Sequence, residues 1–378
     1  WAQWWNVWMT QPLYETPDAL DWQPCASVPV LHSVDALPLR FPVVHDDNRP
    51  DHYSPAELET PGRQMGGRHI AQQILNDFFQ RRGEFYRGSI SSPITAENGC
   101  SRLSPYLALG CLGMRELVQA LRERRRGAEG RWKASLSAFE SRLWWHCHFI
   151  QKLEDQPNME VNNLHPLTER LHRPFDQARF KAWQEGRTGW PLVDACMRYL
   201  TYHGWVNFRM RAMLVSVAAY PLSLPWQPVA QHLATLFTDY EPGIHYPQVQ
   251  MQAGTTGINV PRMYNPILQA QRLDPTGQFV RRWVPELRQV SDQWIFEPWK
   301  MPPKLQQQAN MRLGEDYPAP MVEFSQAVRE ARADLSAIRG SEFKTVSRKI
   351  GAQHGSRKRS SSRRGGKSAA SRQQMDLF

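Results

Sequence analysis

The chain has 378 residues, 41% of them hydrophobic, which is enough for the core of one large or two ordinary domains. Its formal net charge of +10 is concentrated in residues 344–374, which hold ten Lys or Arg and no acid, while the other 36 basic residues balance the 36 acidic ones. Five cysteines without a Cys-x-x-Cys pair argue against a disulfide scaffold or a zinc ribbon. No apolar run approaches the roughly 18 residues of a membrane span.

The first 60 residues are rich in Pro, Trp and Asp and have little periodicity, which predicts an extended connector packed over a core. Four tryptophans near its start are spaced to share one side of a short helix: Trp1, Trp4, Trp5 and Trp8. Because the chain starts at Trp1, without an initiator Met or a secretory signal, we expect it to be a fragment.

Helical periodicity begins after Gly66, where apolar residues recur at 3.6-residue spacing over 70–79. Ser104-Pro105 predicts another helix start, because Pro is favoured at the first helical position. Further helices are predicted over residues 136–153, 192–202, 208–219 and 229–236. Alternating Val and Ile runs are nearly absent, so we expect a mainly α-helical domain over residues 61–335. The basic remainder, residues 336–378, is predicted to be a disordered tail.

The segment Cys100-Ser-Arg-Leu-Ser104 is a candidate anion-binding loop. It places hydroxyl groups, a guanidinium group and free backbone N–H groups at a helix start, which suits a pyrophosphate. An ordinary serine cap is the alternative interpretation. Other nucleotide-binding patterns are missing from the sequence, since no Gly-x-Gly-x-x-Gly occurs and the one Gly-Lys pair lies in the tail.

Two predicted helical faces combine aromatic and basic side chains at i, i+3, i+4 and i+7. The first face consists of Arg142, Trp145, His146 and Phe149, and the second of Trp205, Phe208, Arg209 and Ala212. The run His146-Cys147-His148 does not favour a metal site, because successive helical residues point about 100° apart and converge poorly on one ion. We therefore predict no metal.

Several motifs follow one another between residues 187 and 287. They are Arg187-Thr-Gly-Trp-Pro-Leu-Val-Asp-Ala-Cys-Met-Arg198, Gly204-Trp-Val-Asn-Phe-Arg-Met-Arg211, Asp239, Asn265-Pro-Ile and Asp274-Pro-Thr-Gly-Gln-Phe-Val-Arg-Arg-Trp-Val-Pro-Glu-Leu287. Their order and spacing resemble the flavin-binding domain of the cryptochrome/DNA photolyase family, over residues 62–320. The resemblance implies a multi-helical FAD-binding domain of photolyase type, with residues 1–60 as an interdomain connector. It also implies that the family's N-terminal α/β antenna domain is absent from this chain, and that an antenna chromophore would bind only through that missing domain.

The resemblance implies FAD as the cofactor and assigns residues to it. The phosphate loop would consist of Cys100, Ser101, Arg102, Leu103 and Ser104, with Cys100 in place of the family's first hydroxyl residue. Tyr86 would contact the phosphates, and Arg211 would pair with Asp239 beside the isoalloxazine, although a purely structural salt bridge is the alternative. The remaining cofactor-binding residues would be Phe139, Arg209, Tyr240, Glu241 and His245.

The resemblance also implies a DNA-facing cavity that receives a flipped pyrimidine dimer. Its implied DNA-binding residues are Arg142, Trp145, His146, Phe149, Phe208 and Arg209, with Trp145 stacking on the dimer. In this sequence Arg142 replaces a Glu, Phe208 an Asn and His146 an Arg of the dimer-repair pattern. A site built for hydrogen bonds loses specificity when they vanish, so these departures weaken the case for repair.

Three functions therefore remain open. The first is a blue-light-driven DNA photolyase that repairs pyrimidine dimers by electron transfer from reduced FAD. The alternatives are a cryptochrome-like photoreceptor that binds FAD without repair, and a non-catalytic nucleic-acid-binding protein. We expect a monomer that binds dimer-containing DNA and no membrane, in the cytoplasm, at the nucleoid if the source is bacterial.

Two further departures concern electron flow. His245 occupies the position that faces flavin N5, where an imidazole that protonates near neutral pH would tune the flavin. Val249 replaces the tryptophan nearest the flavin in the family's photoreduction chain, while Trp226 matches the middle tryptophan. We assign catalytic roles to Trp145, Arg142, His245 and Trp226.

Overall fold

The computed structural model describes residues 7–13 and 62–355. The chain divides into two units, residues 1–60 and 61–378. In the first unit the described residues form a helical turn that starts at Val7, where the Thr10 hydroxyl donates to the Val7 carbonyl over 2.7 Å. Trp1, Trp4 and Trp5 of the predicted tryptophan face lie outside the described residues.

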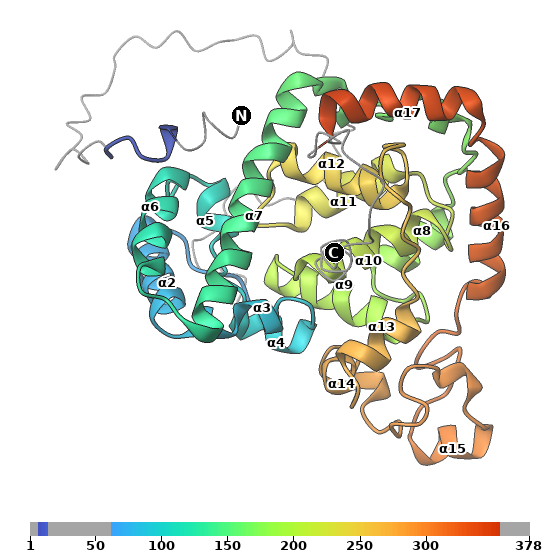
Figure 1. The fold of residues 1–378 in the computed structure, drawn as a ribbon. Coiled ribbons are helices and arrows are strands. Elements are labelled where there is room, and N and C mark those ends of the chain that lie inside the picture. The colour runs from blue at the N-terminus through green and yellow to red at the C-terminus, as the bar shows by residue number, and fades with distance from the viewer. Residues whose placement is uncertain (1–6, 14–61, 356–378) are drawn as a thin grey trace, which may run out of the picture. The chain divides into compact units, whose positions relative to one another are not determined.

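The second unit is built from helices, and its described part contains no strand (Figure 1). None of the described helices is both long and apolar enough to cross a membrane. The first helices are α2 (Arg68–Gln80), α3 (Tyr86–Ser89), α4 (Pro93–Gly99), α5 (Ser104–Ala108), α6 (Met114–Arg125) and α7 (Gly130–Asp155). They are followed by α8 (Gln177–Gln184), α9 (Pro191–His203), α10 (Phe208–Ala219), α11 (Trp226–Leu236) and α12 (Pro242–Ala253). The last are α13 (Pro266–Leu273), α14 (Gln278–Trp283), α15 (Pro303–Gln308), α16 (Phe324–Ala337) and α17 (Ser341–His354).

The mainly α-helical fold is confirmed, and so are the individual helices predicted from the apolar spacing. Helix α10 has the predicted bounds, while α7, α9 and α11 contain the segments predicted within them. Helix α12 was not predicted. Pro247 lies inside it, and its buried residues do not follow one clear helical face. Its end is well defined, since Gly254 adopts the left-handed conformation (φ 79°) that favours glycine after a helix.

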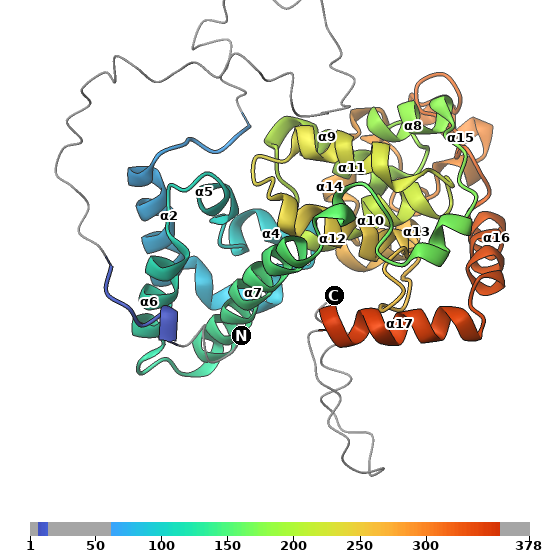
Figure 2. The ribbon, with the colours of Figure 1, turned by 90° about the horizontal axis from the view of Figure 1, so that it is seen from above.

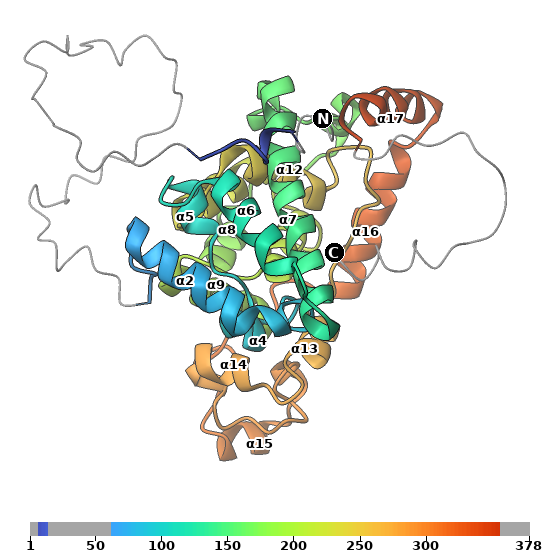
Figure 3. The same ribbon diagram turned by 60° about the vertical axis from the view of Figure 1, so that its left-hand side comes forward.

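Helices α9 and α10 form the centre of the core, and most of their side chains are buried. Helix α10 packs against α9, α11 and α12. The long helix α7 runs beside α12, as Figure 2 and Figure 3 show from two directions. Since α7, α10 and α12 all contact one another or share a neighbour, side chains far apart in sequence meet where these helices face each other.

Asp194 stabilises the first turn of α9 through buried hydrogen bonds. Its carboxylate accepts hydrogen bonds from the Thr188 N–H (2.8 Å) and hydroxyl (2.6 Å), the Gly189 N–H (3.1 Å) and the Tyr317 hydroxyl (2.5 Å). Burial raises the pKa of this carboxyl, and the hydrogen bonds oppose that rise. The motif that begins at Arg187 therefore holds α9 to a distant segment of the chain and serves the fold.

The motif that begins at Asp274 has a similar structural role. The Asp274 carboxylate accepts hydrogen bonds from the N–H groups of Phe279 (3.0 Å) and Val280 (2.9 Å), near the start of α14. Arg198 of α9 forms an ion pair with Glu286 over 2.8 Å. The first and last motifs of the sequence are thus joined to each other in the core.

The folded part continues beyond the expected boundary at residue 335. Residues 341–354 form α17, in which Phe343 is 6% exposed and His354 is 3% exposed. Phe343 stacks on His165, with the ring centroids 3.9 Å apart. The expectation of a disordered tail from residue 336 is therefore wrong up to residue 354, because a few anchoring side chains are hidden among Lys, Arg and Ser in this stretch. Residues 356–378 lie outside the described residues.

Candidate functional site

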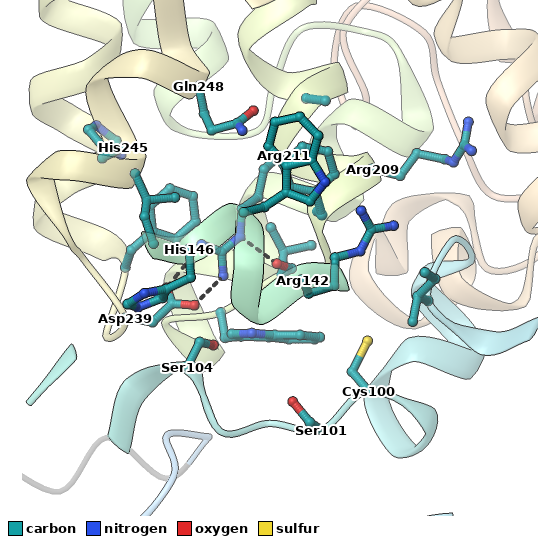
Figure 4. Close-up of a pocket in the computed structure, with 18 of the residues that line it drawn as sticks. Cys100, Ser101, Ser104, Arg142, His146, Arg209, Arg211, Asp239, His245 and Gln248 are labelled. Atoms are coloured by element: carbon teal, nitrogen blue, oxygen red, sulfur yellow. Dashed lines mark hydrogen bonds and ion pairs between the residues drawn. The ribbon is translucent and has the colours of Figure 1, made fainter. Parts of the chain in front are cut away.

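A cavity of about 310 Å³ lies in the second unit, walled by α7, α10, α12 and the loop that leads into α5 (Figure 4). Its volume is within the range of small-molecule and cofactor pockets. Most of the predicted site residues line it: Tyr86, Cys100, Ser101, Arg102, Leu103, Ser104, Phe139, Arg142, Trp145, His146, Phe149, Phe208, Arg209, Arg211, Asp239 and His245. The structure thus brings the predicted phosphate loop and the residues of both predicted faces to one cavity, although Trp205 precedes α10 and so does not share a helical face with Phe208.

The loop from Cys100 to Ser104 forms one side of the cavity, across from Gln248 in Figure 4. Helix α5 begins at Ser104, its N-cap is Leu103, and no side chain caps it. The serine-cap interpretation is therefore wrong, and the Ser104 hydroxyl remains available to the cavity. Arg102 has a positive φ of 60°, a backbone conformation that non-glycine residues rarely adopt. Such conformations occur most often at ligand-binding and active sites.

The Arg102 guanidinium is held from two sides. Its Nε donates to Gln64 Oε1 over 2.9 Å, and its carbon centre lies 4.0 Å from the Trp205 ring centroid. Its buried Nη1 has no hydrogen-bond partner among the described residues. An oriented cation with a spare donor at a cavity wall is suited to an anionic ligand.

Arginines make the whole cavity wall basic. Four of them line it: Arg102, Arg142, Arg209 and Arg211. Asp239 is the single acid among the described lining residues, and it is neutralised by Arg211 through two hydrogen bonds of 3.0 and 2.8 Å. Burial raises the pKa of the Cys100 thiol to about 12, although Arg102 and Arg211 act against this rise. Cys100 is therefore a neutral side chain, and the cavity favours negative charge.

The Arg211–Asp239 pair is rigid. The Asp239 side chain is 4% exposed and that of Arg211 is 24% exposed. Arg211 Nε also donates to the Val206 carbonyl over 2.7 Å, and its guanidinium carbon lies 4.1 Å from the Phe237 ring centroid. Because both partners line the cavity, the pair is positioned to do more than join α10 to the turn between α11 and α12.

Aromatic rings cover the α7 side of the cavity. Trp145 and Phe149 stack with ring centroids 5.6 Å apart and an interplanar angle of 28°. Deeper in the domain, Phe139 packs against Tyr86 at 5.5 Å in an edge-to-face arrangement. On α10, Phe208 is 37% exposed although it lines the cavity. A wall of this kind can receive a flat ring system.

The histidines of the cavity are neutral. Burial lowers the pKa of His245 to about 4, and burial has the same effect on His146. His245 Nε2 lies 2.9 Å from the Ala230 carbonyl, and since a carbonyl can only accept, the proton of the ring resides on Nε2. The expectation that His245 protonates near neutral pH is therefore wrong, because the residue is 7% exposed, and burial together with Arg211 lowers its pKa by more than the Ala230 carbonyl and Asp239 raise it.

Three predicted site residues lie outside the cavity wall. Trp226 begins α11, and its Nε1 donates to Asn163 Oδ1 over 2.6 Å. The Tyr240 hydroxyl donates to the Tyr246 hydroxyl over 3.4 Å. The Glu241 side chain caps α12 by accepting from the Gly243 N–H over 3.3 Å. The side chains of these residues are engaged elsewhere, so they support the helices around the site.

A polar face of α12 was missed by the sequence analysis. Gln248 and Gln252 line the cavity together with His245, at i, i+3 and i+7. Gln248 Oε1 is buried and has no hydrogen-bond partner among the described residues. No helix was predicted over residues 242–253, so this spacing was not recognised as a helical face.

Comparison with known proteins agrees with this geometry. Residues 139–337 match the FAD-binding domain of DNA photolyase. The chain is 33% identical to a deoxyribodipyrimidine photo-lyase of Streptomyces griseus over 282 residues, covering 74% of this chain and 57% of the relative. It is 32% identical to cryptochrome-2 of Arabidopsis thaliana over 267 residues, covering 68% of this chain and 43% of the relative.

Solved structures show the same relationship. A bacterial class III photolyase from Agrobacterium tumefaciens superposes with a TM-score of 0.67 at 29% identity, covering 72% of this chain and 56% of that one. A Synechocystis cryptochrome also gives a TM-score of 0.67, at 30% identity, covering 71% of this chain and 56% of that one. The chain thus spans little more than half the length of the photolyases that it matches.

The residues of the cavity fit FAD. A diphosphate requires cations and hydroxyls, which Arg102, Ser101 and Ser104 provide, and the flat ring system requires an apolar and aromatic wall. Among the buried polar atoms without a partner in the described residues, Arg102 Nη1, His146 Nδ1 and Gln248 Oε1 belong to residues that line the cavity and can serve a ligand. FAD is the cofactor of this domain, and the chain belongs to the DNA photolyase/cryptochrome family.

Proposed function

We propose that the chain is the FAD-binding, substrate-binding part of a blue-light-driven DNA photolyase that reverses pyrimidine dimers. The observation that carries this proposal is the cavity itself, in which the stacked pair of Trp145 and Phe149 stands beside a basic wall. Flat, uncharged bases suit the aromatic surface, while the DNA backbone suits the arginines. Because the proposed substrate is a pyrimidine dimer in DNA, the protein would act on DNA, which in a bacterial cell lies in the nucleoid.

The residues divide into two groups in this proposal. Ser101, Ser104 and Arg102 hold the FAD phosphates, and the Arg211–Asp239 pair orients the ring system from the α10 side. Reduced FAD, when bound and excited by blue light, would supply an electron to the dimer. Trp145 provides the stacking surface for a dimer that has been flipped out of the helix, which costs a few kcal/mol and less for a damaged base.

Arg142, Phe208 and His146 set the chemistry of the substrate side. Arg142 offers donors to carbonyl or phosphate oxygens, and the half-buried, neutral His146 offers no charge. Phe208 offers only a ring surface. The cavity therefore recognises its substrate by stacking and by donation to acceptors, with no free carboxylate among the described lining residues.

A cryptochrome-like photoreceptor is the second candidate function. The lack of a free carboxylate among the described lining residues favours it, because repair enzymes of the family place a Glu where Arg142 stands. In that case the same FAD site operates without repair, and the output passes to a protein partner.

A repair assay on the FAD-loaded protein separates the two functions. The protein is reduced, mixed without oxygen with an oligonucleotide that contains one thymine dimer, and exposed to blue light, while an identical sample stays dark. A photolyase restores the intact thymines in the light and not in the dark, as chromatography of the digested DNA measures. FAD-loaded protein that binds the oligonucleotide but restores no thymine in the light would rule out the photolyase proposal.

A further inference from the structure

Helix α17 lies beyond residues 139–337, the stretch that matches the photolyase domain. One face of α17 is fixed to the domain near both of its ends. At the first end, Phe343 stacks on His165, and His165 Nε2 donates to the Phe343 carbonyl over 3.2 Å. At the other end, His354 Nε2 hydrogen-bonds with Gln156 Oε1 over 2.8 Å. These contacts determine which face of α17 points away from the domain.

The outward face of α17 is basic. Lys344, Arg348 and Lys349 are exposed, and none of them forms an ion pair with a described residue. Glu342, the acid of this helix, faces Arg170 at 3.8 Å. Seven more Lys or Arg follow in residues 357–372, whereas the chain before residue 344 is balanced in charge. The positive excess of the protein is therefore concentrated at this helix and the sequence that follows it.

Helix α17 ends beside α7, the helix that carries the aromatic wall of the cavity. Its last residue, His354, hydrogen-bonds with Gln156, the residue that directly follows α7. On α7 itself, Trp145 lines the cavity and packs against His148, with ring centroids 5.5 Å apart. The basic face of α17 and the aromatic wall therefore adjoin the same helix, and Figure 1 shows the end of α17 beside the end of α7.

We propose that α17 is a second DNA-binding element, which contacts backbone phosphates of a duplex beside the cavity. The proposal rests on DNA as the partner in the proposed function, but not on repair. Exposed cations that neutralise phosphates release counterions and bind any sequence. Such contacts position the duplex, while the cavity recognises the lesion. Lys344, Arg348 and Lys349 therefore add affinity for damaged and undamaged DNA alike.

The test compares two triple variants of the full chain that lose the same charge. The first is Lys344→Gln with Arg348→Gln and Lys349→Gln. The control is Arg272→Gln with Arg288→Gln and Lys304→Gln, three exposed cations in the region of α13 to α15, at the end of the unit away from α17 (Figure 1). Dissociation constants are measured at several salt concentrations for an undamaged duplex and for the same duplex with one thymine dimer.

The α17 variant is expected to lose on the order of tenfold affinity for both duplexes at low salt, and its salt slope should fall by about 0.9 for each phosphate contact removed. The ratio of the two affinities and the FAD content should not change, and the control should bind as the unmodified protein does. Unchanged affinity, or an equal loss in the control, would overturn the proposal. A loss confined to the dimer duplex would also overturn it, since it would place α17 in lesion recognition.

Two further outcomes distinguish this proposal from RNA binding and from the photolyase proposal. Tighter binding of an RNA hairpin than of either duplex by the unmodified protein would assign the basic face to RNA and overturn the proposal. If the unmodified protein repairs no dimer but its duplex affinity still depends on the three α17 cations, the photolyase proposal fails while the DNA-binding role of α17 stands.

Discussion

Trp145 stands in the cavity wall with one ring face against Phe149. If it supports a flipped dimer, Trp145→Ala should weaken binding to dimer-containing DNA by about 1–3 kcal/mol, the value of one base–aromatic stack. The FAD content should be unchanged, because the phosphate loop lies on another side of the cavity. Trp145→Phe, which keeps a ring, serves as the control in the same titration. Unchanged affinity in Trp145→Ala would mean that this tryptophan only packs the helix.

The Arg211–Asp239 pair and the Arg281–Asp292 pair have similar shortest N–O distances, 2.8 and 2.7 Å, but different burial. The Asp239 side chain is 4% exposed and that of Asp292 is 76% exposed. Removal of one partner from a buried pair leaves an uncompensated charge, so Asp239→Asn should lower the free energy of unfolding by about 3–5 kcal/mol and reduce FAD content. Asp292→Asn should change it by about 0–1 kcal/mol. Urea denaturation and flavin release would measure both effects; equal effects would contradict the assignment of a buried, functional pair.

His245 makes a pH-dependent contribution to stability. Burial lowers its pKa to about 4, below the ordinary 6.5, so the unfolded chain binds more protons than the folded one between these values. The contribution is complete above about pH 6.5 and is lost as the pH falls toward 4. In urea titrations across this range, His245→Asn should reduce the pH dependence of the free energy of unfolding. The exposed His69→Asn should leave it unchanged, and an unaltered slope in both variants would show that His245 is not buried as described.

At the scale of elements, α11 and α12 decide how an electron can reach the cavity. Val249 of α12 lines the cavity, while Trp226 at the start of α11 is buried outside the cavity wall, with its ring centroid 6.5 Å from that of Tyr246. A valine has no accessible redox state, so Val249→Trp should speed the photoreduction of bound FAD while Trp226 is in place. When Val249 is retained, Trp226→Phe should have little effect on the rate of photoreduction. Time-resolved absorption measures both, and rapid photoreduction that Trp226→Phe alone abolishes would contradict this arrangement.

The helices of the site also differ in how well the sequence predicts which of their faces lines the cavity. The α7 face was found from the spacing of Arg142, Trp145 and Phe149, because one continuous helix fixes which residues share a side. The face of α12 was not found, because no helix was predicted over residues 242–253, which include Pro247. Proline loses its N–H bond there, yet the packing of α12 against α7 and α10 offsets that loss.

At the scale of the whole molecule, Asp194 joins α9 to residue 317, and this contact can be tested. Tyr317→Phe removes the hydroxyl that donates to the buried carboxylate over 2.5 Å. The loss of a donor to a buried acceptor should lower the free energy of unfolding by about 1–3 kcal/mol. The control Tyr202→Phe alters a 43% exposed residue and should have little effect in the same denaturation experiment. If Tyr317→Phe instead removes FAD without a loss of stability, the motif has a direct role in the site.

The sequence by itself determined the helical class, the family and the loop from Cys100 to Ser104, because these depend on local spacing and on residues that are neighbours in the chain. It also predicted the Arg211–Asp239 pair through the order of motifs. Only the tertiary structure decided which motif acids serve the site: Asp239 lines the cavity, whereas Asp194 and Asp274 hold the core. Likewise, only the surroundings of His245 made it neutral, and only the contacts of α17 with α7 and His165 ordered a segment that its composition predicts to be disordered. Burial and long-range partners set these properties, and neither is encoded in a short stretch of chain.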